Sequence, residues 1–376
     1  MTAVQGPDSR QAWSARLDQV ERARAALALD AVVVSAPVNV RYLTGFDGSS
    51  GLLVLSRGAR FLLVDGRYDA SARAAVEQGD LAIMSVERVP ETYAGGLARL
   101  IGRLRARRVG FESATVTVAT LSAWQRRDPS VEWVGTERLV ENLRLVKDEQ
   151  EREIFRRAGR LLSDVAGQLP ALVRAGLTGR DIARSIDRAL ETAGFSGPAF
   201  PTIVASGPES AHPHARPSER RLAPGALVVL DFGGVLDGYC VDLTRMAAVG
   251  AIAPEAARLF EAVRDAQAAA LGAVRPGAAG ATVDRAARQV LAERGLSEAF
   301  LHATGHGLGL EVHEAPRLGQ AGGSEFPEVL AEGMVCTIEP GAYVAGLGGA
   351  RLEDDVLVTS GGFEALTTAP RDLLVV

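Results

Sequence analysis

The sequence predicts an α/β protein built from two domains, residues 1–140 and 141–376. Three observations predict this organisation. A length of 376 residues favours two domains over one, strand and helix patterns alternate through the first part, and a segment of the second part recurs later in the chain. Hydrophobic residues make up 47% and charged residues 23% of the sequence, as in globular proteins that bury a large core.

The first domain is expected to alternate strands with helices. Residues 28–36 (ALDAVVVSA) are expected to form a buried strand, and residues 51–65 a hairpin around the turn SRGA. A helix is expected over residues 67–79, ending at Gly79, and a further strand over residues 107–113. This alternation is typical of an α/β domain.

The domain boundary is expected near Glu141. Asp148 is followed by Glu151 at the spacing of a capping box, and the helical pattern EQEREIFRRAGRLLSDVAGQL comes next. A long helix that opens a new domain accounts for this change of pattern. The alternative is one continuous domain with a long internal helix.

An internal repeat predicts that the second domain consists of two related halves. Residues 173–196 align without gaps with residues 274–297, with 8 identities in 24 positions. Each copy has the pattern of a helix end, a Gly turn and a new helix closed by Gly194 or Gly295. The alternative is a chance alignment of Ala-, Gly- and Arg-rich helices. Two related halves would place a ligand site in the cleft between them.

Composition argues against several classes of protein. A net charge of −5 argues against a nucleic-acid-binding surface. The N-terminus, MTAVQGPDSRQAW, lacks an apolar core of signal-peptide length. The sequence also contains no run of about 18 apolar residues, which is the length needed to span a membrane. Cys240 and Cys336 lie in apolar, strand-like runs, which favours buried thiols in a reducing compartment over a disulfide. We therefore expect a cytoplasmic protein.

Two aspartates are expected to lie on one face of a hairpin formed by residues 227–249. A turn at Leu236-Asp237 would put Asp231 directly opposite Asp242, and a turn at Asp237-Gly238 would make them diagonal neighbours. Both side chains share a face in either register. Two neighbouring carboxylates on a buried face repel each other unless a cation lies between them.

Two glutamates and one histidine complete a predicted metal site. Glu339 ends the apolar run MVCTIE, and Glu353 lies in ARLEDDVLV, where alternation puts Arg351, Glu353 and Asp355 on one face and Asp354 on the other. One acid of the EDD group suffices as a ligand, and the others are expected to be solvated or paired with Arg351. Four carboxylates and one imidazole suit two divalent cations and are too rich in oxygen for a structural zinc site. The set is Asp231, Asp242, His306, Glu339 and Glu353.

All five histidines lie in two Gly/Pro-rich segments: His212, His214, His302, His306 and His313. A lone histidine is more often a structural residue, but five that are confined to two segments favour a functional site. Imidazoles are useful there because they move protons near neutral pH and donate to a developing oxyanion.

These segments resemble the Xaa-Pro peptidases, the prolidase and aminopeptidase P group of the pita-bread metallopeptidases. The resemblance covers nearly the whole chain. NVRYLTGF and LLVDGRY resemble the N-terminal domain of the family, LRLVKDEQEREIFRRAG its domain-joining helix, and GHGLGLEVHEAP, TIEPGAY and RLEDDVLVT its catalytic segments. The resemblance implies a creatinase/prolidase-like α/β domain followed by a pita-bread catalytic domain made of two αβ halves.

The resemblance also implies how the metals are held. Asp242 and Glu353 would bridge two divalent ions, expected to be Mn²⁺, with Co²⁺ or Zn²⁺ as alternatives. Asp231 would complete the ligand shell of one ion, and His306 and Glu339 would complete that of the other.

Further residues would act on the substrate. His214 matches the substrate-facing histidine of the family, on a loop over the site, and His302 and His313 match the outer histidines beside the scissile carbonyl. Tyr343 and Arg351 match positions that support the ligands or contact the substrate.

The activity implied is hydrolysis of the Xaa-Pro imide bond. Water activated by the metals would attack the carbonyl before proline, Glu339 would move a proton to the leaving nitrogen, and His313 or His214 would stabilise the oxyanion. Proline lacks an N–H and fixes φ, so peptidases that need that N–H fail on it. We expect a homodimer that acts on small proline-containing peptides, without nucleic-acid or membrane partners.

We favour an Xaa-Pro dipeptidase (prolidase) over an Xaa-Pro aminopeptidase (aminopeptidase P). A dipeptide ends in a free carboxylate after proline, and Arg41, in the apolar segment VNVRYL, is the candidate to bind it from the same or a partner subunit. The alternative is a surface arginine that caps a strand. The segments FDGSSG and DGRY look more like the aminopeptidase P branch, which remains the alternative function.

Three more distant alternatives fit the retained ligands or the domain organisation less well. A creatinase-like hydrolase shares the fold and needs no metal. A methionine aminopeptidase lacks an N-terminal domain of this kind. A non-catalytic pita-bread binding module loses metal ligands, whereas this chain keeps all five candidate positions.

Overall fold

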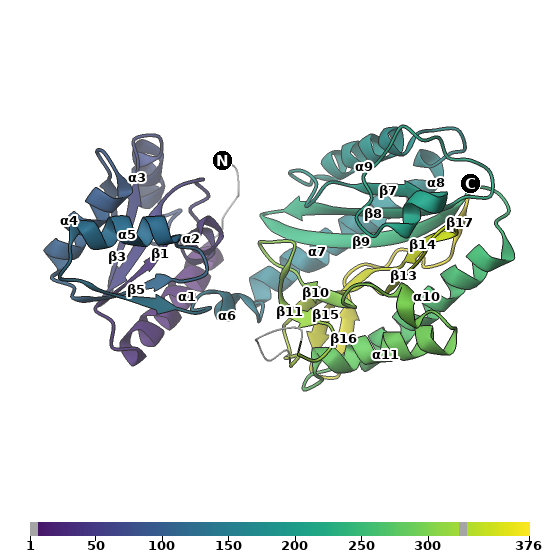
Figure 1. The fold of residues 1–376 in the computed structure, drawn as a ribbon. Coiled ribbons are helices and arrows are strands. Elements are labelled where there is room, and N and C mark those ends of the chain that lie inside the picture. The colour runs from purple at the N-terminus through teal and green to yellow at the C-terminus, as the bar shows by residue number, and fades with distance from the viewer. Residues whose placement is uncertain (1–6, 323–328) are drawn as a thin grey trace. The chain divides into compact units, whose positions relative to one another are not determined.

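The computed structural model describes residues 7–322 and 329–376 and divides into two compact units, Met1–Arg144 and Leu145–Val376 (Figure 1). The division falls a few residues after Glu141, at the end of helix α6 (Glu141–Arg144). The first six residues, which begin the N-terminal segment expected to lack a signal peptide, lie outside the described residues.

The first unit is built on a six-stranded mixed sheet with the order β4-β3-β2-β1-β5-β6. Strand β1 lies in the interior of this sheet, paired antiparallel to β2 and parallel to β5, and its four residues are fully buried. The strands are β1 (Ala31–Val34), β2 (Leu52–Ser56), β3 (Ala59–Val64), β4 (Ser85–Arg88), β5 (Arg108–Glu112) and β6 (Glu132–Thr136). The helices besides α6 are α1 (Pro7–Ala26), α2 (Pro37–Thr44), α3 (Asp69–Gln78), α4 (Tyr93–Leu104) and α5 (Val118–Arg127).

The elements predicted for this unit are confirmed, including the β2–β3 hairpin and the end of α3 at Gly79, which has the left-handed conformation (φ 72°). One interpretation was wrong: the segment with Arg41 belongs to helix α2, so Arg41 does not cap a strand. Pro37 starts this helix, and the buried Glu112 carboxylate accepts hydrogen bonds from the backbone N–H groups of Ser35 and Ala36 at its N-terminus. These contacts come from a strand far along the chain.

The second unit consists of helices outside two main sheets, with a small third sheet (Figure 1). The sheets have the orders β17-β9-β8-β7, β11-β10-β12-β15-β16 and β13-β14. The helical elements are α7 (Glu149–Ala166), α8 (Leu169–Leu172), α9 (Gly179–Ala193), η1 (Gly207–Ala211), α10 (Pro254–Ala273), α11 (Gly280–Glu293) and η2 (Ser297–Ala299). The strands are β7 (Ile203–Ser206), β8 (Leu227–Leu236), β9 (Tyr239–Ala248), β10 (Gly305–Gly307), β11 (Glu314–Leu318), β12 (Val335–Ile338), β13 (Gly341–Val344), β14 (Gly348–Arg351), β15 (Asp354–Thr359), β16 (Gly362–Ala365) and β17 (Leu374–Val375).

The two copies of the repeat have the same local structure. In each, a helix ends, a left-handed glycine makes the turn (Gly176, φ 82°; Gly277, φ 80°), and the next helix, α9 or α11, begins. Helices α7 and α9 pack in one apolar core with β8 and β9, whereas α10 and α11 pack in another with β12. Helix α7 begins with the predicted capping box of Asp148 and Glu151.

The turn between β8 and β9 decides the register of the two aspartates. Asp237 (φ 51°) and Gly238 (φ 91°) form a two-residue turn in which both residues have positive φ, as a type I′ turn requires. Gly233 therefore pairs with Asp242 and Asp231 with Thr244, so the aspartates are diagonal neighbours on one face.

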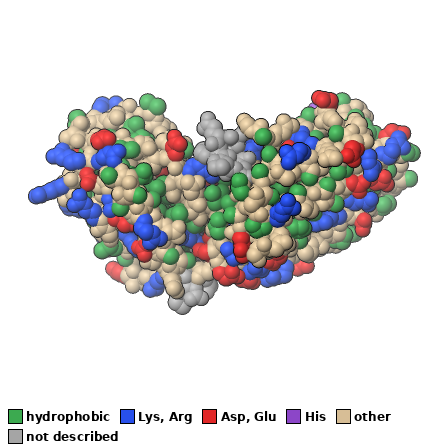
Figure 2. All heavy atoms as spheres, turned by 90° about the horizontal axis from the view of Figure 1, so that it is seen from below, with side chains coloured by type: hydrophobic (Ala, Val, Ile, Leu, Met, Phe, Trp, Pro, Cys, Tyr) green, Lys and Arg blue, Asp and Glu red, His purple; other side chains and the backbone are tan. Residues whose placement is uncertain are grey.

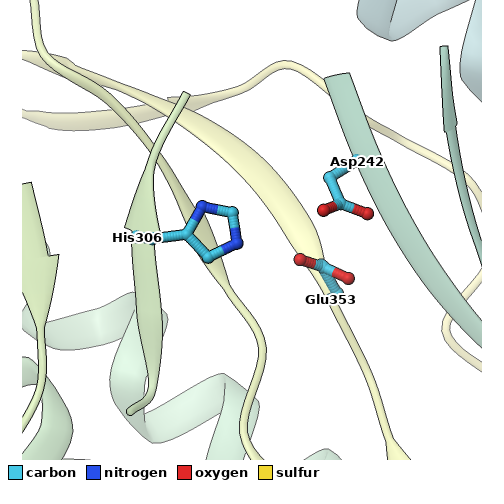
Figure 3. Close-up of side chains that lie close together, drawn as sticks. All are labelled: Asp242, His306 and Glu353. Atoms are coloured by element: carbon cyan, nitrogen blue, oxygen red, sulfur yellow. The ribbon is translucent and has the colours of Figure 1, made fainter. Parts of the chain in front are cut away.

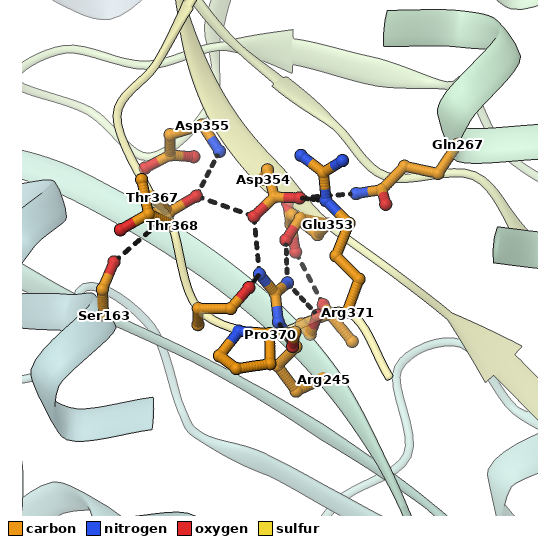
Figure 4. A network of polar contacts seen from close by, with 12 residues as sticks. Ser163, Arg245, Gln267, Glu353, Asp354, Asp355, Thr367, Thr368, Pro370 and Arg371 are labelled. Carbon is orange, nitrogen blue, oxygen red and sulfur yellow. Dashed lines mark hydrogen bonds and ion pairs between the residues drawn. The ribbon is translucent and has the colours of Figure 1, made fainter. Parts of the chain in front are cut away.

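The EDD segment differs from the single strand expected for it. The chain forms two strands, β14 and β15, which are interrupted at Leu352 and Glu353. Asp354 is neither solvated nor paired with Arg351: it is fully buried, forms ion pairs with Arg245 and Arg371 at 2.7 Å each, and accepts hydrogen bonds from Gln267 and Thr367 (Figure 4). Two guanidinium groups from other segments neutralise this carboxylate inside the core.

None of the helices in the described ranges 7–322 and 329–376 is long and apolar enough to cross a membrane. Cys240 and Cys336 are buried and form no disulfide. On the face of the second unit in Figure 2, basic and acidic side chains lie interspersed.

Candidate active site

A cavity of about 580 Å³ in the second unit collects most of the predicted site residues. All five predicted metal ligands line it, together with the three other predicted histidines and Arg351. Its apolar wall includes Phe200, Pro201 and Ile203, which precede or begin β7. The predicted residues along it are Asp231, Asp242, Glu339, Glu353, His306, His214, His302, His313 and Arg351.

Asp242, His306 and Glu353 form the closest group. A potential ligand atom of each lies within 4.8 Å of those of the others, and the three side chains point toward one another from β9, β10 and the residue just before β15 (Figure 3). Glu353 is held in place because one carboxylate oxygen accepts a hydrogen bond of 2.6 Å from the hydroxyl of Thr244. Three elements that are distant in sequence thus bring two carboxylates and one imidazole together.

Three carboxylate oxygens of the site are buried without a hydrogen-bond partner among the described residues: Oδ1 of Asp231, Oδ1 of Asp242 and Oε1 of Glu353. A buried carboxylate oxygen with no partner is costly. Divalent cations such as Mn²⁺ prefer carboxylate oxygen, with imidazole as a compatible further donor. The residues therefore fit divalent metal ions.

Burial and mutual repulsion both raise the pKa values of the acids in this site. Burial raises the pKa of Asp242 and of Glu353 well above its usual range, and neighbouring carboxylates raise both further. Burial also raises the pKa of Glu339 to about 8, and it lowers the pKa of His306 to about 4. A bound cation would reverse the effect on the acids, because it favours their ionised form.

Glu339 lies between two of the histidines. Its Oε1 is 3.6 Å from Nε2 of His306, and its Oε2 is 4.0 Å from Nδ1 of His302. Its backbone N–H donates to the carbonyl of Thr304 at 2.7 Å, which fixes the start of the turn after β12. The carboxylate therefore lies between the ligand cluster and His302.

A hydrogen-bond chain connects Asp231 to His302. Arg351 donates to Asp231 and, at 2.6 Å, to the hydroxyl of Tyr343, which is 2.9 Å from Nε2 of His302. Nδ1 of His302 lies 2.8 Å from the carbonyl of Ala303, and a carbonyl only accepts. In this arrangement Nδ1 carries the hydrogen and Nε2 accepts from Tyr343, so His302 is oriented as an acceptor. Tyr343 supports His302 and Arg351 and does not itself line the cavity.

The other two predicted histidines lie at the edge of the cavity. His214 is exposed in the loop after η1, and His313 is exposed at the end of the loop between β10 and β11. The rings of His306 and His313 meet edge to face, with centroids 4.4 Å apart. His212 is exposed and does not line the cavity. Arg41 belongs to the first unit, and its role in binding a carboxylate stays a prediction.

Two basic residues that line the cavity were not predicted from the sequence. Arg216 follows His214 in the segment PHARP, and Arg317 lies on β11, directly across the strand pair from His306. Arg216 could have been predicted, because it is only two residues from His214 in the sequence. The position of Arg317 opposite His306 depends on strand pairing, which a single sequence does not reveal.

A buried group of carboxylates with one imidazole, beside a cavity with apolar and basic walls, is a donor set typical of metal-dependent hydrolases. Comparison with known proteins gives the family. The chain belongs to metallopeptidase family M24, whose model matches residues 153–360, and residues 16–146 match the creatinase/prolidase N-terminal domain. The predicted family and fold class, a creatinase-like domain followed by a pita-bread domain, are confirmed.

Similar proteins cover nearly the full length of the chain. An Xaa-Pro dipeptidase of Pyrococcus furiosus is 32% identical over 96% of this chain and 99% of its own length. An Xaa-Pro dipeptidase structure from Bacillus anthracis has a TM-score of 0.90 at 31% identity, covering 97% of this chain and 100% of that one. An X-Pro aminopeptidase structure from Thermotoga maritima has a TM-score of 0.85 at 32% identity, covering 96% and 100% of the two chains.

Proposed function

We propose that this protein hydrolyses the imide bond of Xaa-Pro dipeptides with two divalent metal ions. The observation that carries the proposal is the convergence of Asp242, His306 and Glu353 beside the cavity, with unpartnered carboxylate oxygens among them. Asp231 and Glu339 would complete the ligand set. The similar proteins named as Xaa-Pro dipeptidases support the substrate class.

When bound, the metal ions supply a nucleophile from water at neutral pH and polarise the carbonyl before proline. The residues of the chain do the rest. Glu339 takes up the proton that the attacking water releases and delivers it to the proline nitrogen, which needs protonation to leave. His313 and His214 stand at the cavity edge, where a ring N–H donates to the developing oxyanion. His302 keeps Tyr343 and, through it, Arg351 in place.

The walls of the cavity match the two ends of a dipeptide. Phe200, Pro201 and Ile203 offer an apolar surface for the proline ring, which has no N–H to satisfy. The free carboxylate after proline needs a cation. Arg41 remains one candidate, and Arg317, which lines the cavity itself, is a second.

An Xaa-Pro aminopeptidase acting on longer peptides is the second candidate function. The X-Pro aminopeptidase structure from Thermotoga maritima, at a TM-score of 0.85, favours it. The metal is proposed to be Mn²⁺, because carboxylates dominate the ligand set, with Co²⁺ or Zn²⁺ as alternatives. A cytoplasmic homodimer that acts on small proline-containing peptides completes the proposal.

The test compares Ala-Pro with Ala-Pro-Gly after EDTA treatment and reloading with Mn²⁺. A dipeptidase cleaves Ala-Pro at least tenfold faster in kcat/KM. Equal rates would transfer the proposal to the aminopeptidase. Absence of cleavage of both peptides in the Mn²⁺, Co²⁺ and Zn²⁺ forms would refute it.

A further inference from the structure

Lys147 is the single lysine among the 41 lysine and arginine residues of the chain, and it is buried, with 1% of its side chain exposed. Every other cationic position carries arginine. Burying a long charged side chain is costly unless it has partners, so this residue is unusual in both composition and location. It lies just before the N-cap of α7, and nothing in the proposed mechanism uses it.

The backbone of Lys147 is fixed on both sides. Its N–H donates to the carbonyl of Gly333 at 2.8 Å, and its carbonyl accepts from the guanidinium of Arg152 at 2.8 Å. The side chain runs inward, and its Nζ lies 3.5 Å from Oε1 of Glu314. Only 9% of the Glu314 side chain is exposed, and this side chain also lines the cavity, so the salt bridge lies at the wall of the active site.

Glu314 closes the base of the loop that carries His313. This loop, residues 308–313, joins β10 to β11, and Glu314 pairs with Gly307 across its base. The carboxylate of Glu314 fills the space beside Gly309, where a Cβ atom would lie 1.4 Å from Oε1. The loop thus begins two residues after His306, ends at His313, and has the Glu314 carboxylate packed against its backbone.

We propose that Lys147 is a positioning residue of the active site, whose salt bridge to Glu314 holds the 308–313 loop so that His313 stays at the cavity edge. The role assigned to His313 rests on the proposed function. A lysine suits this place because its compact ammonium group needs less room than the planar guanidinium of arginine. The side chain of Lys147 thereby links the segment before α7 to the base of the 308–313 loop.

The test neutralises both charges together, in the double variant Lys147→Met/Glu314→Gln. Removing one partner alone leaves a buried charge and endangers folding, whereas removing both avoids that penalty. We expect a melting temperature close to that of the wild type. For Ala-Pro we expect kcat to fall about 10- to 100-fold with a change in KM below about threefold, because an oxyanion contact acts in the transition state.

A matched control neutralises another ion pair of the same unit, Arg156 and Glu364, whose atoms are 3.0 Å apart and which does not line the cavity. The variant Arg156→Gln/Glu364→Gln should keep the kcat and KM of the wild type. Wild-type kcat in the Lys147→Met/Glu314→Gln variant would overturn the positioning role and leave Lys147 a structural residue.

A second measurement does not depend on the activity. The five histidine rings, labelled with ¹³C, give resolvable NMR signals that His→Gln variants assign. The Lys147→Met/Glu314→Gln variant should shift the signal of His313 and leave that of His212 unchanged. An unshifted His313 signal would overturn the proposal. If the wild type cleaves no Xaa-Pro peptide, the proposed function fails, and the NMR signal still decides the role of Lys147.

Discussion

The substitution Glu353→Gln tests two contributions to the free energy of unfolding separately: the destabilisation by the buried carboxylates and the stabilisation by bound metal. Burial raises the pKa of Glu353 well above its usual range, which favours the protonated form when no metal is bound, and glutamine mimics this neutral form. Its Oε1 has no hydrogen-bond partner among the described residues, so little is lost there. The variant should therefore change the stability of the metal-free protein by less than about 1 kcal/mol.

When Mn²⁺ is added, the melting temperatures of the wild type and of the Glu353→Gln variant should differ. A ligand at 100 times its dissociation constant stabilises the folded state by about 2.7 kcal/mol. For a unit the size of Leu145–Val376, each kcal/mol corresponds to about 2–4 °C, so Mn²⁺ should raise the melting temperature of the wild type by about 5–11 °C. The variant lacks a proposed bridging carboxylate and should gain less than half of this shift.

The assay is thermal unfolding followed by circular dichroism, in EDTA and in Mn²⁺, beside the hydrolysis of Ala-Pro. Glu364→Gln is the control, since this glutamate pairs with Arg156 outside the cavity and should leave the Mn²⁺ shift intact. A Glu353→Gln protein with the full Mn²⁺ shift and wild-type activity would refute the bridging role. If the metal-free variant melts more than about 8 °C below the metal-free wild type, the inference that a neutral Glu353 side chain is favoured without metal is refuted.

Three further predictions concern the metal content, the length of the substrate and the dependence of stability on pH. Elemental analysis should find about two Mn²⁺ ions per chain in the wild type, none in Asp242→Ala and at least one in His306→Ala; two ions in Asp242→Ala would contradict the ligand assignment. Arg41→Ala should lower kcat/KM for Ala-Pro by about 10- to 150-fold and spare Ala-Pro-Gly, as expected for a lost bond worth about 1.5–3 kcal/mol; if Arg317→Gln gives this pattern instead, the carboxylate binds in the cavity of the second unit. Burial raises the pKa of Cys336 to about 12, so the folded protein keeps a proton that the unfolded chain loses above about pH 9, and stability falls as pH rises. The loss is at most about 1.4 kcal/mol per pH unit, and urea titrations should give a shallower slope for Cys336→Ser.

The sequence by itself determined the features that depend on local periodicity and on short motifs. The capping box of Asp148, the β8–β9 hairpin and the two helix–glycine–helix copies are all present where the pattern predicted them. The family could be identified because its motifs are contiguous stretches. The same motifs named the acids and histidines that the structure brings to one cavity.

Only the tertiary structure decided which side chains meet. The choice between two hairpin registers depended on the φ angles of Asp237 and Gly238. The burial of Asp354 depended on ion pairs with two arginines from distant segments. Arg317 faces His306 through strand pairing, and Lys147 reaches Glu314 across more than 160 positions of sequence. Such contacts are invisible in a single sequence because burial and long-range packing, and not local pattern, select them.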